Sequence, residues 1–194
     1  MVNFLSDSIA DLYVRRNIIL PEEKEVYKCG VELILNDIIT FSLVILISAI
    51  FFKARFAFEF LITLCFTRVY CGGYHAAKAY MCRLSMLITF FGVMMISYAL
   101  AELSEWILYL ILIISFVVLL PLIPVKHPNK TLTQELIIKN RRKGIITYIV
   151  FSIISILICH FVNRQDAFII TLSLSAVTVL AIIGTLVNER RCRE

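Results

Sequence analysis

Charged residues are scarce in this chain. Asp, Glu, Lys and Arg make up 17% of its 194 residues, whereas 60% of the residues are hydrophobic. Soluble domains have about 25% charged residues and about 45–50% apolar residues, and a soluble core of this size could not bury such long apolar runs. The composition therefore excludes a soluble protein and predicts an all-α polytopic membrane protein.

Features that would divide the chain are also absent, because it has no internal repeat, no glycine–serine linker and no low-complexity segment. We therefore assign residues 1–194 to a single membrane domain. The first thirty residues lack the basic start and the uninterrupted apolar stretch of a secretory signal peptide, so we expect no cleavage there. Instead, the apolar residues of FLSDSIADLYVRRNIIL, residues 4–20, recur near every third or fourth position. This pattern predicts an amphipathic helix lying in the membrane interface within residues 1–30.

Long apolar runs follow this region, and each is long enough to cross the hydrocarbon core, which takes about 17 to 25 residues. Five of them are residues 31–52, 84–100, 106–125, 145–162 and 167–187. A sixth run, residues 56–70, contains Glu59 and Arg68, and we interpret it as either a span or a re-entrant hairpin. We therefore expect about six transmembrane helices within residues 31–188.

The lysines and arginines are unevenly distributed between the two ends of these spans. In a six-span arrangement, all 19 except Lys53, Arg55 and Arg164 fall on one side. Basic residues accumulate in cytoplasmic loops, so we expect both termini and the basic loop of residues 126–143 in the cytoplasm. The net charge of +5 is then explained by this orientation and by contact with anionic membrane lipids. We expect no nucleic-acid partner.

The six cysteines do not indicate disulfides. In this arrangement Cys29, Cys71, Cys82 and Cys192 fall on the reducing side, and the other two lie in or beside apolar runs. We predict that all except Cys82, which is considered separately, are small apolar fillers. A zinc site at Cys71, His75 and Cys82 is disfavoured, because paired C-x-x-C or H-x-x-x-H spacing is missing and a fourth ligand would be needed. We expect no metal and no cofactor.

One stretch concentrates reactive side chains: RVYCGGYHAAKAYMC, residues 68–82. A histidine can withdraw the proton of a cysteine and create a nucleophilic thiolate, but on one continuous helix His75 and Cys82 would lie about 10 Å apart along the axis. The paired glycines just before His75 permit a turn that brings the two together. The alternative is chance, because such pairs are common and two glycines can simply mark a close helix crossing. The other pair, Cys159 and His160, is adjacent, so its side chains diverge on a helix and His160 is predicted to be interfacial.

This stretch, extended to RVYCGGYHAAKAYMCRLS, resembles the signature of the accessory gene regulator B family. These are membrane cysteine endopeptidases that process autoinducing peptide precursors in Gram-positive quorum sensing. The spacing matches at Arg68, Gly73, His75 and Cys82. The length, the polytopic layout and the proline-bounded basic loop PLIPVKHPNKTLTQELIIKNRRKG also resemble the family, so the likeness covers nearly the whole chain.

The resemblance implies that Cys82 is the nucleophile and His75 the general base. It also implies that Arg68 and Gly73 are needed for activity or for the shape of the site. The thiolate would attack a peptide bond of a precursor signal peptide, expel the C-terminal segment and leave a thioester on Cys82. An internal cysteine or serine of the precursor could then close a thiolactone or lactone ring. No third catalytic residue is evident.

The precursors of this family have an acidic C-terminal region, which the resemblance suggests is bound by Lys126 and Lys130, although the positive-inside rule alone would explain these lysines. For Arg68 the resemblance favours a carboxylate partner, on the substrate or at Asp37 or Glu59; the alternative is an interfacial anchor.

The expected location is the bacterial cell membrane, with a multi-pass chain and the active site on the cytoplasmic side. A homodimer stays open.

A different class of function also stays open. The embedded charges Asp37, Glu59 and Arg68 would suit a small transporter or peptide exporter subunit, in which His75 titrates or gates and Cys82 is inert. A neighbouring reading frame for a peptide with an amphipathic helix, a central cysteine or serine and an acidic tail would favour the peptidase.

The uneven distribution of basic residues predicts the topology. Single cysteines introduced into a cysteine-free background at positions 127–143 or 190–194 should resist a membrane-impermeant thiol reagent in intact cells, and cysteines at positions 102–105 should react with it. Labelling of the 127–143 loop from outside would contradict this orientation. If only cysteines within residues 53–70 are labelled from the side opposite to the expected one, the result would instead support the re-entrant hairpin.

Overall fold

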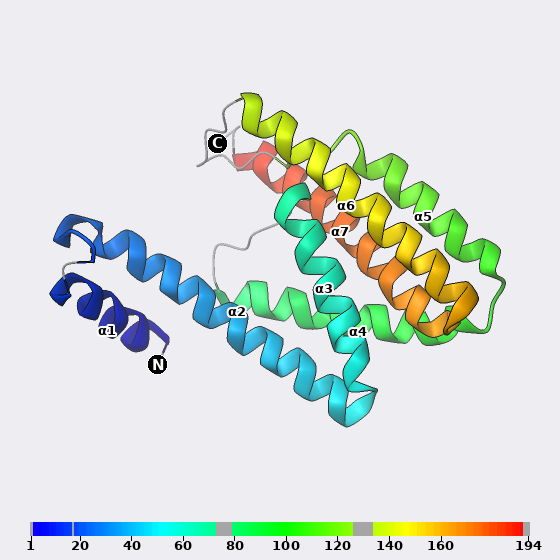
Figure 1. Cartoon of the computed structure of the whole chain (residues 1–194), viewed down its shortest axis with the longest axis horizontal. Coiled ribbons are helices and arrows are strands. Elements are labelled where there is room, and N and C mark those ends of the chain that lie inside the picture. Colours follow the sequence, from blue (N-terminus) through cyan, green and yellow to red (C-terminus); the bar gives the residue numbers. More distant parts are fainter. Residues whose placement is uncertain (1, 17, 73–78, 126–133, 192–194) are drawn as a thin grey trace.

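The regular structure of the chain is helical. The computed structural model describes residues 2–16, 18–72, 79–125 and 134–191 (Figure 1). Over these ranges it contains no strand, which confirms the predicted all-α class. The elements are α1 (Val2–Arg15), the short 3-10 helix η1 (Pro21–Glu23), α2 (Lys24–Phe51), α3 (Ala54–Cys71), α4 (Ala79–Ala101), α5 (Glu105–Leu119), α6 (Gln134–Phe161) and α7 (Arg164–Arg191).

Four helical segments of the described chain are long and apolar enough to cross a membrane. They are Pro21–Phe51, Met81–Ala101, Gln134–Phe161 and Arg164–Val187. The helix α5 has 15 residues, about 22 Å, because Pro121 and Pro124 follow it and proline cannot continue a helix. The helix α3 is one continuous helix that carries three charged residues. Four candidate spans are therefore found among the described residues; the expected number of six and the re-entrant hairpin are not confirmed.

The predicted N-terminal helix is present as α1, and it packs against the first turns of α2. Lys24 Nζ lies 2.7 Å from Asp11 Oδ1 and 3.4 Å from Asp7 Oδ1, and Lys28 Nζ lies 3.3 Å from Asp7 Oδ1. The hydrogen bond from Lys28 and the charge of Lys24 hold the pKa of Asp7 below its ordinary value. Figure 1 shows α1 and the first turns of α2 away from the other helices, whereas the later part of α2 meets α3 and α4. Its position in the membrane interface stays a prediction.

The helix α7 lies at the centre of the bundle. In its apolar segment 67% of the residues are buried, against 22–28% in the other three candidate spans. It packs against α3, α4, α5 and α6. Many of its inward residues are small or hydroxylated, including Ala167, Thr171, Ser173 and Thr178, and such residues allow helix backbones to approach closely.

Buried hydroxyl groups connect α7 to α5 and α6. Ser155 Oγ on α6 donates a hydrogen bond to the carbonyl of Ala167 at 2.8 Å, so the hydroxyl of Thr171, also 2.8 Å away, must donate to Ser155. Tyr148 on α6 shares a hydrogen bond with Ser115 on α5, and Thr178 donates to the carbonyl of Ser115 at 3.3 Å. These contacts satisfy polar groups that would be costly to bury alone.

The end of α3 meets the segment after α5 and the beginning of α6. The amide of Val125 donates to the carbonyl of Cys71 at 3.1 Å. A Cβ atom at Gly144 of α6 would lie 3.1 Å from Cys71 Sγ and 3.3 Å from Ile123 Cγ2. Gly72, which ends α3, has a φ of 76°, a conformation that favours glycine. We call this end of the bundle the basic end, because the basic first turns of α6 lie here.

Candidate active site at the start of α4

Cys82 lies in the first turn of α4 and is half-buried. Its thiol is free, and its backbone carbonyl accepts a hydrogen bond from Ser85 Oγ at 2.8 Å. The N–H groups of a helix's first turn have no partners within the helix and give that end a partial positive charge. The thiol of Cys82 therefore lies beside the free N–H groups at the start of α4.

The residue after Cys82 joins α4 to α2. Arg83 Nη2 donates to Asn36 Oδ1 at 3.0 Å, and Asn36 Nδ2 donates to the carbonyl of Glu32 at 2.9 Å. Asn36 is only 8% exposed, so the link is well shielded. Arg83 Nε is buried and has no hydrogen-bond partner among the described residues. This link was not anticipated from the sequence, where 47 positions separate its two residues.

Arg68 lies on the last turn of α3, half-buried, and its carbonyl accepts the amide of Gly72 at 2.9 Å. The pairing of Arg68 with Asp37 or with a substrate carboxylate stays a prediction. Glu59 precedes Arg68 by nine positions on the same continuous helix, so the two lie about 13 Å apart along the axis and on opposite faces. Glu59 is therefore not the partner of Arg68.

The other predicted site residues lie outside the described residues. These are Gly73, His75, Lys126 and Lys130. The contact between His75 and Cys82 and the binding of an acidic peptide by the two lysines therefore stay predictions. The structure does describe the residues that flank them. Gly72 comes directly before the 73–78 segment, and Val125, which directly precedes the basic loop, lies next to Gly72.

Cys71 and Cys82 have different surroundings. Cys71 is fully buried against Gly144 and Ile123, whereas Cys82 is partly exposed. The burial of Cys71 agrees with its predicted role as a small apolar filler. Within the described parts of the chain, no three His, Cys, Asp or Glu side chains are grouped so as to hold a metal ion.

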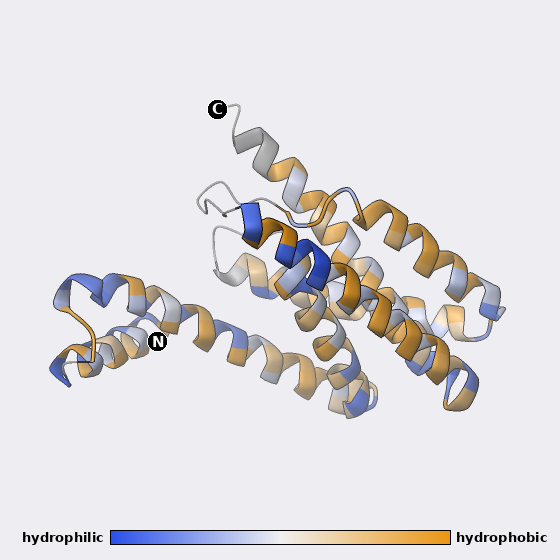
Figure 2. Cartoon of the chain, turned by 45° about the horizontal axis from the view of Figure 1, so that its top comes forward, coloured by the Kyte–Doolittle hydropathy of each residue, from blue (hydrophilic) through white to orange (hydrophobic). Residues whose placement is uncertain are grey.

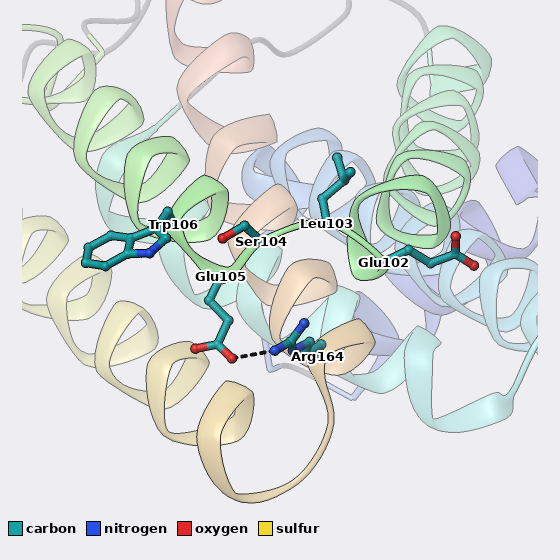
Figure 3. Close-up of a pocket in the computed structure, with 6 residues that line it drawn as sticks. All are labelled: Glu102, Leu103, Ser104, Glu105, Trp106 and Arg164. Carbon is teal, nitrogen blue, oxygen red and sulfur yellow. Dashed lines mark hydrogen bonds and ion pairs between the residues drawn. The ribbon is translucent and has the colours of Figure 1, made fainter.

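A second polar cluster lies at the opposite end of the bundle, around the turns after α4 and α6 (Figure 3). Arg164 Nη2 lies 2.7 Å from Glu105 Oε1, and these residues line a shallow pocket of about 340 Å³ with Trp106 and others. His160 Nε2 lies 2.8 Å from the hydroxyl of Tyr109. These contacts tie the start of α5 to the turn between α6 and α7, which gives His160 a bridging role that the sequence did not predict.

Together, the apolar helices and the half-buried cysteine at a helix start define a polytopic helical membrane protein with a candidate cysteine nucleophile. The chain matches the family model described as accessory gene regulator B over residues 6–185, and it therefore belongs to this family. Membership supports a role in accessory gene regulation and autoinducer processing. No curated protein and no solved structure gives a significant match.

The Arg83–Asn36 hydrogen bond should hold the first turn of α4 against α2. Asn36→Leu leaves the guanidinium without its acceptor and should lower the free energy of unfolding by about 1–3 kcal/mol. Asn36→Asp keeps the acceptor for Arg83 but loses the donor to the carbonyl of Glu32, so it should lose less stability than Asn36→Leu. Reversible unfolding in mixed micelles, followed by circular dichroism, checks both; equal stability of Asn36→Leu and wild type would show that the bond contributes nothing.

Proposed function

We propose that this protein is a membrane cysteine endopeptidase that removes the C-terminal segment of an autoinducing peptide precursor. The observation that carries the proposal is the spacing of Arg68, Gly73, His75 and Cys82 in a chain that belongs to the accessory gene regulator B family. The half-buried, free Cys82 at the start of α4 supports it, because a nucleophile must be both shielded and reachable.

The proposed reaction uses two groups of this chain. His75 accepts the proton of the Cys82 thiol, and the thiolate attacks the carbonyl carbon of the scissile peptide bond. The C–N bond then breaks, and the protonated His75 returns its proton to the departing amine. A thioester between Cys82 and the N-terminal part of the precursor remains.

Ring closure would follow by exchange of the acyl group. A cysteine thiol of the precursor gives up its proton, attacks the thioester carbonyl and forms a thiolactone, and Cys82 regains a proton as it leaves. One thioester replaces another, so the exchange is nearly balanced in bond energy. A serine hydroxyl would give a lactone by the same steps.

The surrounding residues would position the precursor. Arg68, at the end of α3, carries a positive charge suited to a carboxylate of the substrate or of Asp37. The family resemblance gives Gly73 a role in the shape of the site; it directly follows Gly72, where φ is 76°. Lys126 and Lys130 would bind the acidic tail of the precursor. We place the site at the cytoplasmic face of the bacterial cell membrane, as the distribution of basic residues predicts.

The catalytic assignment can be tested with the precursor coexpressed in cells. Cys82→Ala should leave the protein folded in the membrane and abolish cleavage, because only the sulfur is removed. His75→Ala should lower the rate about 10² to 10⁴-fold through loss of the base. In wild type, a precursor whose ring-closing residue is alanine should accumulate as a hydroxylamine-sensitive adduct on Cys82, detectable by mass spectrometry.

Replacement of the other cysteines provides the controls. Cys29 is exposed, so Cys29→Ala tests whether loss of an accessible thiol matters in itself; it should keep wild-type cleavage, and so should alanine or serine at positions 65, 71, 159 and 192. Cleavage at the wild-type rate in Cys82→Ala, with no adduct, would remove the peptidase proposal. A transporter or exporter subunit would then be the better explanation.

The role of the basic loop needs a separate test. Lys126→Glu with Lys130→Glu should weaken cleavage by repelling an acidic tail, and acidic-to-basic changes in the tail should partly restore it. Cleavage rates are compared at equal amounts of membrane protein. Loss of expression without rescue would leave the two lysines with only the role of a topology signal.

A further inference from the structure

The first turns of α6 carry a basic groove on their outer face. Its lining residues are Glu135, Ile138, Lys139, Arg142, Lys143 and Ile146, and they enclose a shallow volume of about 550 Å³. The three cationic side chains are exposed, and Lys143 Nζ lies 5.4 Å from the centre of the Tyr70 ring. We refer to these six residues as the α6 groove.

The packing of Gly144 determines which way the α6 groove faces. Gly144 is pressed against Cys71 and Ile123 on the inner side of the helix. At about 100° per residue, Arg142 points about 160° away from Gly144, toward the outside, whereas Arg141 points only about 60° away. Arg141 carries the same charge on the same helix turn, yet it does not line the groove.

The α6 groove lies where the helix becomes apolar. From Ile145 to Phe161 the helix has no Lys, Arg, Asp or Glu, and Figure 2 shows this change from hydrophilic first turns to a hydrophobic remainder. The cations therefore lie at the level expected for lipid phosphates. Ile146, 51% exposed, lies one turn below Arg142, at the level where acyl chains begin.

We propose that the α6 groove binds the headgroup of an anionic phospholipid. Arg142 is suited to two parallel hydrogen bonds with a phosphate, and Lys139 and Lys143 add positive charge on either side. Ile146 contacts the first part of an acyl chain. An acidic peptide is the less suitable occupant, because Glu135 also lines the groove and its carboxylate would repel the acidic side chains of such a peptide.

The test uses detergent-solubilised full-length protein titrated with phosphatidylglycerol or phosphatidylcholine, with bound lipids counted by native mass spectrometry. Wild type should bind its first phosphatidylglycerol more tightly than phosphatidylcholine. Arg142→Gln should weaken that first binding step about fivefold, the effect of about one cation at a lipid surface. Arg141→Gln is the matched control and should change it less than twofold.

Other outcomes would overturn the proposal. Equal losses in Arg141→Gln and Arg142→Gln would show diffuse attraction by net charge, and equal affinity of wild type for the two lipids would show no headgroup site. A hexaglutamate peptide that binds wild type but not Arg142→Gln, while phosphatidylglycerol binding stays unchanged, would identify a peptide site instead. Circular dichroism of each variant establishes that the helices are retained.

Discussion

The bundle depends on the burial of α7 with its polar side chains satisfied. A buried hydroxyl without a partner costs about 1–3 kcal/mol, so a helix rich in serine and threonine can lie at the centre only when its neighbours accept and donate hydrogen bonds. Ser155 and Thr171 do this between α6 and α7, and Thr178 reaches the carbonyl of Ser115 on α5. Their small size also lets four helices approach α7 closely.

The central position of α7 separates two ends with different chemistry. At the end of the bundle opposite the basic end, where short turns follow α2, α4 and α6, Arg55 is paired with Asp166 at 3.0 Å and Arg164 with Glu105 at 2.7 Å. At the basic end, the exposed cations of α6 have no acidic partners within 4.0 Å among the described residues, and Cys82 lies at the start of its helix. The first end is therefore suited to joining helices, whereas the second is suited to anionic molecules and to the proposed chemistry.

The fit of α3 against α6 connects the proposed site to this framework. Gly144 lets the two helices meet at Cys71, and the amide of Val125 binds the carbonyl at the end of α3. A larger residue at position 144 would have to displace the sulfur of Cys71. The ends of the 73–78 segment are thus held on one side by α3 and on the other by α4, whose first turn is joined to α2 through Arg83.

Composition and local spacing determined the class of this protein. Long apolar runs with few charges are stable in a lipid bilayer, and a helix satisfies the backbone hydrogen bonds of such a run there. The spacing from Arg68 to Cys82 likewise determined the family, which the match over residues 6–185 confirms. Helix periodicity acts over a few residues, so it gave no means of finding the Arg83–Asn36 bond or the bridge between His160 and Tyr109. The apolar run of residues 106–125 predicted a longer helix than α5, which ends at Leu119, and nothing in the sequence indicated that α7 is central. Only the tertiary structure decided these features, because each depends on which distant helices meet and on which of their faces are in contact.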